Sequence, residues 1–152
     1  MSPANEDDTV KVTGELELRL IHADGSEEIT RVKNLVLNLG KEVIANRMLA
    51  APTKAAMACI AVGTSNVVVG PGDIGLGAEV GRANLQSTTV VGPKITYIAQ
   101  LLPGVGSGAL VEAGVFNDPA PGAGIELART TFPVINKGPT DTLQITWNVT
   151  VG

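Results

Sequence analysis

The side chains that could do chemistry are few and lie far apart in this 152-residue chain. His22 is the only histidine and Cys59 the only cysteine, which excludes zinc sites of four Cys or His ligands, disulfide frameworks and haem attachment. His22 lies two residues before Asp24 and could act as a base, but none of the five serines has the G-x-S-x-G surroundings of a nucleophile. We therefore expect a histidine at a strand end and a buried, inert cysteine.

The carboxylates offer two further kinds of site. Glu79 and Glu112 could be the acids of a glycosidase, but no spacing singles them out, and aromatic platforms for a sugar are nearly absent. Asp73 and Asp118 lie in Gly/Pro-rich loops and could bind calcium, although the alternating Asp/Asn loop with its closing Glu is missing. We expect no metal and no cofactor, and we favour a protein that is not an enzyme.

Residues 70–75, Gly-Pro-Gly-Asp-Ile-Gly, match the G-x-G-x-x-G pattern of dinucleotide-binding turns. Such a turn needs a helix whose N-terminus holds the pyrophosphate, and Gly77 and Gly81 interrupt any helix here. No acid follows between Glu79 and Glu112 to hold the ribose. The motif therefore predicts a loop.

Charge is concentrated at the N-terminus, since residues 1–28 carry a net charge of −6 and residues 29–152 a net charge of +2. The chain has no basic run and no stretch of 18 apolar residues, so we expect neither a nucleic-acid partner nor a membrane. Residues 1–9 are predicted to be an extended acidic arm, which is either a solvated tail or a segment that docks on a basic partner. In the second case, the partner-binding residues are Pro3, Asn5, Glu6, Asp7 and Asp8.

The elements that must position these residues are mainly strands. Apolar and polar residues alternate from Val10 to Leu20, a turn follows at 23–26, and residues 27–32 return as an antiparallel partner. One helix is predicted over about 39–50, capped by Asn38 and ended by Pro52, and one helical turn over 76–80. Gly and Pro together supply 27 residues and separate further strands at 55–62, 84–91, 94–102, 109–116, 125–132 and 141–151.

This element order predicts a single mainly β domain over 10–152, an antiparallel β-sandwich or barrel-like fold with one inserted helix and an aliphatic core. Trp147 lies in the middle of the most regular strand, where it is either a core anchor or a hot spot between subunits. Tyr97 lies on a strand with little charge on either face, which makes it a second candidate for a subunit interface.

Several short segments together resemble the small virion structural proteins of tailed bacteriophages, whose labels include head decoration and tail or fibre components. The resemblance covers about residues 10–151, and its specificity lies in the order of the segments. They are residues 33–38 (Lys-Asn-Leu-Val-Leu-Asn), 60–65 (Ile-Ala-Val-Gly-Thr-Ser), 75–80 with Arg82, 112–117 (Glu-Ala-Gly-Val-Phe-Asn), 127–132 and 141–147.

The resemblance implies a non-enzymatic protein of the phage particle, assembled in the host cytoplasm. Our leading interpretation is a capsid decoration (cement) protein that binds the major capsid protein on the outer surface of the head as a homotrimer. The alternative is a tail-fibre or baseplate-associated module. Glu112, Arg82 and Arg129 in the matching segments are expected to form buried ion pairs that fix loops.

Overall fold

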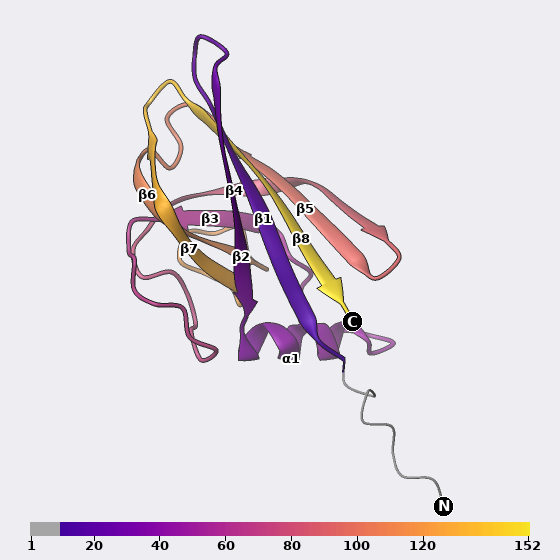
Figure 1. Ribbon diagram of the computed structural model, residues 1–152. Helices are drawn as coiled ribbons and strands as arrows, with labels where there is room; N and C mark the ends of the chain where they lie inside the picture. Colours follow the sequence, from indigo (N-terminus) through magenta and orange to yellow (C-terminus); the bar gives the residue numbers. More distant parts are fainter. Residues whose placement is uncertain (1–9) are drawn as a thin grey trace, which may run out of the picture.

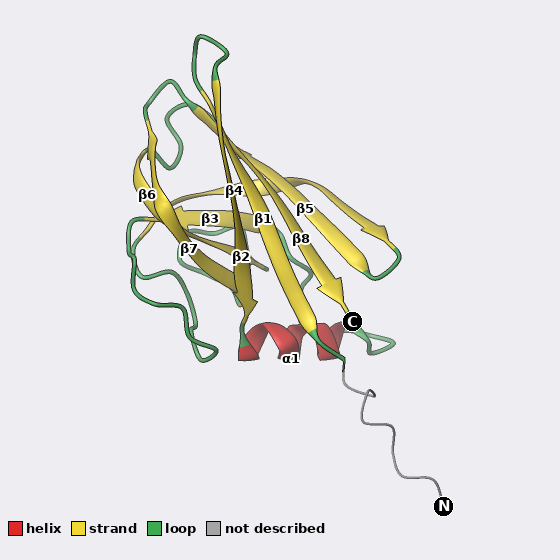
Figure 2. Ribbon diagram, in the orientation of Figure 1, coloured by secondary structure: helices red, strands yellow, loops and turns green. Residues whose placement is uncertain are grey.

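A computed structural model describes residues 10–152. The predicted arm over 1–9 lies outside the described residues, and so do its predicted partner-binding residues Pro3, Asn5, Glu6, Asp7 and Asp8. Eight strands and one helix follow one another along the chain (Figures 1 and 2). They are β1 (Val12–Ile21), β2 (Glu27–Val36), α1 (Asn38–Arg47), β3 (Cys59–Gly63), β4 (Glu79–Val91), β5 (Lys94–Leu101), β6 (Gly108–Phe116), β7 (Glu126–Lys137) and β8 (Thr142–Val151).

The strands form a closed antiparallel barrel in the order β1-β2-β7-β6-β3-β4-β5-β8, which confirms the predicted mainly β, barrel-like fold with one helix. β2 and β4 are shared between two sheets. One sheet is β2-β1-β8-β5-β4, and the other is β2-β7-β6-β3-β4. The barrel is joined weakly at one seam, because β2 pairs with β7 only through Leu35–Arg129 and Val36–Ala128.

The interior is aliphatic around one indole, as the alternation of β1 and β8 predicts. Leu16, Leu18 and Trp147 are all at most 2% exposed, and their neighbours on β5 and β8 continue the same core. Trp147 donates its Nε1–H to Asn34 Oδ1 at 2.8 Å. Asn34 lies opposite Gly14 in the β1–β2 pair, where a Cβ would overlap Asn34 Oδ1, so glycine is needed there for Asn34 to reach the indole.

α1 lies across one end of the barrel (Figure 1) and packs on β7, where a Cβ on Gly40 would meet the Leu127 carbonyl. The helix is shorter than the predicted 39–50, and Asn38 is its first residue rather than its cap. Leu37 occupies the N-cap position and makes no side-chain cap hydrogen bond. Leu37 is instead fully buried, so apolar burial sets this helix end. No helix in residues 10–152 is long and apolar enough to cross a membrane.

Four strand boundaries differ from the sequence prediction by four or five residues. β2 continues to Val36, past the predicted end at 32. β3 is confined to Cys59–Gly63 and does not include residues 55–58. β4 starts at Glu79 rather than at the predicted 84, because residues 79–84 pair with β3. The predicted helical turn over 76–80 is wrong, since residues 76–78 are not helical and residues 79–80 belong to β4. β7 continues through Pro133 to Lys137, and proline is tolerated because the β6–β7 register shifts there, between Leu110 and Glu112.

Candidate functional site

Charged residues are buried on the outer face of the sheet formed by β7, β6, β3 and β4. Along β6, Ala113 and Val115 face the barrel core, whereas Glu112 and Phe116 lie on the other side of the strand. Residues 64–78, called loop 64–78 below, and residues 117–125, called loop 117–125, each bond to buried polar groups of this sheet. Two arginines hold the two loops, Arg129 on β7 and Arg82 on β4.

Glu112 is the anchor of loop 64–78 and is 0% exposed. Its carboxylate accepts backbone N–H bonds from Ser65 at 2.9 Å, Gly77 at 2.8 Å and Ala78 at 2.8 Å. Both ends of the loop are therefore tied to one side chain. The burial of the charge is offset by these donors and by Arg129, whose Nη2 lies 3.0 Å from Glu112 Oε1.

Arg129 joins this anchor to the far part of loop 64–78. Its guanidinium pairs with Asp73 at 3.2 Å as well as with Glu112, and it donates to the Val67 carbonyl at 3.2 Å. Asp73 also accepts the Gly70 N–H at 2.9 Å, which closes a turn. The predicted loop at 70–75 and the predicted buried pair of Glu112 and Arg129 are thus both confirmed.

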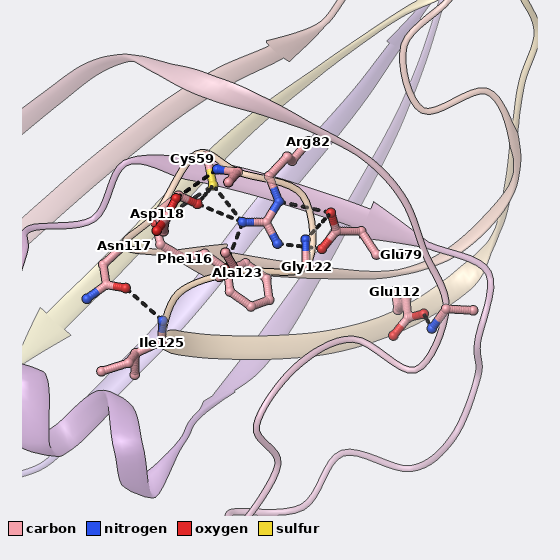
Figure 3. Close-up of polar contacts among 12 residues, drawn as sticks. Cys59, Glu79, Arg82, Glu112, Phe116, Asn117, Asp118, Gly122, Ala123 and Ile125 are labelled. Carbon is pink, nitrogen blue, oxygen red and sulfur yellow. Dashed lines mark hydrogen bonds and ion pairs between the residues drawn. The ribbon is translucent and has the colours of Figure 1, made fainter.

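Arg82 holds loop 117–125 in the same way (Figure 3). Its guanidinium pairs with Glu79, donates to the carbonyls of Asp118 at 2.7 Å and Ala123 at 3.0 Å, and lies 4.5 Å from the centre of the Phe116 ring. The expectation that Arg82 forms a buried ion pair is confirmed. Arg82 therefore fixes loop 117–125 to the sheet.

Cys59 lies under the same loop and is fully buried, as predicted. Its thiol donates to the Asp118 carbonyl at 3.1 Å. Burial raises the pKa of Cys59, so the thiol stays protonated at neutral pH. Cys59 therefore acts as a small buried side chain and not as a nucleophile.

Glu126 is a buried carboxyl that sequence reasoning did not single out. It is 1% exposed, and neither of its carboxyl oxygens has a hydrogen-bond partner. Burial raises the pKa of Glu126 to about 8, even though the positive charge of Arg129 acts in the opposite direction. Its Oε2 fills the space that a side chain at Gly114 would need, since a Cβ there would overlap it. Glu126 is therefore mainly protonated at pH 7.

The remaining sequence candidates do not assemble into a catalytic site. Glu79 and Glu112 each pair with an arginine of their own, so they do not form an acid pair facing open space. Both ring nitrogens of His22 face carboxylates, Glu28 at 2.7 Å and Asp141 at 3.1 Å, and these two partners raise the pKa of His22. In residues 10–152, no three His, Cys, Asp or Glu side chains are grouped so that they could hold a metal ion.

The two aromatic candidates for a subunit interface, Trp147 and Tyr97, differ in burial. Trp147 is 0% exposed, which makes it a core anchor with no surface to offer a second subunit. Tyr97 lies opposite Trp147 in the β5–β8 pair and is only partly buried. It lines a small cavity near α1 together with Ile44 and Met57, and burial raises its pKa.

Loop 64–78 exposes three aliphatic side chains, while Glu112 and Arg129 bond to its backbone from the sheet side. Val67 is 65% exposed, Val68 is 85% exposed and Ile74 is 75% exposed. Apolar side chains exposed together on one loop can form part of a protein-contact surface. The sequence contained a signal for this surface, because Val67, Val68 and Val69 stand together in a Gly/Pro-rich segment, but it does not tell which of them are buried.

Comparison of the chain with protein-family models, with curated proteins and with solved structures found no match in any of the three.

Proposed function

We propose that this protein is a non-enzymatic capsid decoration protein of a bacteriophage, which binds the major capsid protein on the outer surface of the head as a trimer and stabilises the shell. The assignment to a phage particle rests on the resemblance of several short sequence segments, in the same order along the chain, to small virion proteins of tailed bacteriophages. The observation that carries the binding role is loop 64–78, which presents Val67, Val68 and Ile74 on a backbone fixed by buried ion pairs.

A fixed apolar loop suits this role for an energetic reason. Association costs less when the contacting segment is already ordered, because less conformational entropy is lost on binding. In loop 64–78 that order comes from Glu112 and Arg129, which contact the loop from the sheet side and leave the apolar side chains free for a partner. Burial of three aliphatic side chains is worth several kcal/mol, at about 1.5–3 kcal/mol for each fully buried side chain.

The acidic residues 1–9 are a second proposed contact with the major capsid protein. They hold Glu6, Asp7 and Asp8 directly before the barrel. An attachment that depends on these acids weakens as salt rises toward 1 M, where the screening length falls to about 3 Å. An attachment through loop 64–78 alone does not respond in this way.

The experiment is a sedimentation assay with purified protein and phage heads that lack it. We expect the wild-type protein to sediment with heads and Val68→Lys to bind at least tenfold more weakly. Val134→Lys is the matched control, because Val134 is an exposed valine, at 57%, on β7. A chain that lacks residues 1–9 is the third sample and is expected to show reduced occupancy at low salt.

Two results would overturn the proposal. One is binding of Val68→Lys that equals that of Val134→Lys. The other is sedimentation of the wild-type protein with purified tails and not with heads, which points to the tail-fibre or baseplate alternative. Circular dichroism on each variant keeps loss of binding separate from loss of folding.

A further inference from the structure

We infer that the free edge of β4, residues 86–91, pairs with the same segment of a second copy of this chain. β3 pairs with β4 only over residues 79–84, and β5 pairs with it over residues 85–91. A register shift between Leu85 and Ser87 marks the point where β4 leaves β3. Figure 1 shows the end of β4 as the outermost strand of the hairpin at the right of the barrel.

The main chain of this segment is unpaired on its outer side. The last contact on that side is the hydrogen bond from the Leu85 N–H to the Ala58 carbonyl at 2.9 Å. Among residues 10–152, only β5 forms backbone hydrogen bonds with residues 86–91. A row of unpaired N–H and C=O groups is a template for another extended strand.

The side chains do nothing to prevent such pairing. The segment reads Gln-Ser-Thr-Thr-Val-Val and has no charge, and Val90 and Val91 are 66% and 73% exposed. Proteins usually protect a free strand edge with charged side chains. The β4 edge is β-branched and neutral, a composition that favours strand addition.

The other edge of the same sheet gives an internal comparison. β2 pairs with β7 only at Leu35 and Val36, so its residues 27–34 are also without a second strand. Those eight residues include Glu27, Glu28, Arg31 and Lys33. β7 also partly covers them, since Thr130 Oγ1 donates to the Lys33 carbonyl at 2.7 Å. The β2 edge is therefore charged and partly covered, whereas the β4 edge is neither.

A second copy fits the β4 edge better than an unrelated charged strand, because a neutral edge offers no counter-charge to a partner. Gly92, at φ 56°, and Pro93 form the two-residue turn to β5. In such a hairpin Val91 and Lys94 form the first hydrogen-bonded pair, so Thr88 and Val90 direct their main-chain groups away from β5. A two-fold axis at Thr88 then places Thr88 opposite its copy and Val90 opposite Gln86 of the copy.

This contact is separate from the proposed contact with the capsid. Loop 64–78 leads into β4 at Glu79, and the free edge is at the other end of the strand. In a layer of decoration trimers, the β4 pairing would join one trimer to the next.

Disulfide trapping tests the pairing directly in the purified full-length chain. Residues directly opposite each other in an antiparallel pair have Cα atoms about 4.5–5.5 Å apart, within the about 4.4–6.8 Å that a disulfide spans. We expect Thr88→Cys to form a covalent dimer under mild oxidation with diamide, and a reductant to reverse it. Val134→Cys is the control for an exposed strand position, and the native Cys59 is buried and contributes no background.

A second change distinguishes pairing from random collision. Val90→Lys, introduced beside Thr88→Cys, places a charge on the edge and is expected to reduce the yield of dimer at least tenfold. The inference is overturned if Thr88→Cys forms dimers no faster than Val134→Cys, if Val90→Lys has no effect, or if Thr88→Cys on intact particles links to another protein and not to a second copy. Heads are not needed for the first two measurements, so a failure of the proposed function leaves them interpretable.

Discussion

At the scale of single residues, the outer face of the β7-β6-β3-β4 sheet contains one carboxyl group with no partner. Glu112 has three backbone donors and an arginine, whereas Glu126 has none of these. The pKa of Glu126 is raised to about 8 by burial, so folding favours its protonated form. Between about pH 5 and 8 the unfolded chain loses this proton and the folded chain keeps it. The free energy of unfolding therefore decreases as pH rises through this range.

Glu126→Gln is expected to remove that pH dependence, because the amide does not ionise. At about 1.4 kcal/mol for each pH unit, the wild-type protein loses up to about 4 kcal/mol between pH 5 and 8, and the variant loses clearly less. Urea unfolding at a series of pH values measures this. Glu42→Gln, at an exposed helix position, is the control. Equal slopes for Glu126→Gln and the wild type would show that Glu126 is not the group responsible.

At the scale of elements, loop 64–78 owes its order to residues outside it. Removing one member of a buried pair leaves an uncompensated charge and costs about 3–5 kcal/mol. We expect Glu112→Gln to reach this range and to speed hydrogen exchange at the Ser65, Gly77 and Ala78 amides. Glu17→Gln, which breaks partly exposed pairs with Arg19 and Arg31, is expected to cost only about 0–1 kcal/mol. Similar losses in the two variants would contradict the anchoring role.

How far the sequence predicts each element depends on what fixes that element. β1 and β8 follow from alternation alone, because one of their faces lies in the core. The start of β4 does not follow from alternation, because residues 79–84 are ordered by β3 and by the ion pair of Glu79 with Arg82. β7 extends past Pro133 because of a register shift that only the partner strand reveals. The exposed tip of loop 64–78 escapes prediction for a similar reason, because its order comes from Glu112 and Arg129, which are distant in sequence.

At the scale of the whole molecule, a closed barrel carries the two proposed contact surfaces. One is the apolar loop 64–78, held by buried ion pairs, and the other is the neutral edge of β4. Neither surface brings together groups for a reaction. The composition agrees with this reading, since the aliphatic, Gly-rich and Pro-rich chain builds a scaffold and its few arginines position loops.

The most direct measurement is a cryo-EM reconstruction of the phage particle at a resolution that places this barrel. The account predicts density for the protein at the local threefold positions of the head, with Val67, Val68 and Ile74 buried against the major capsid protein. Density confined to the tail, or a barrel on the head whose loop 64–78 faces solvent, would contradict it.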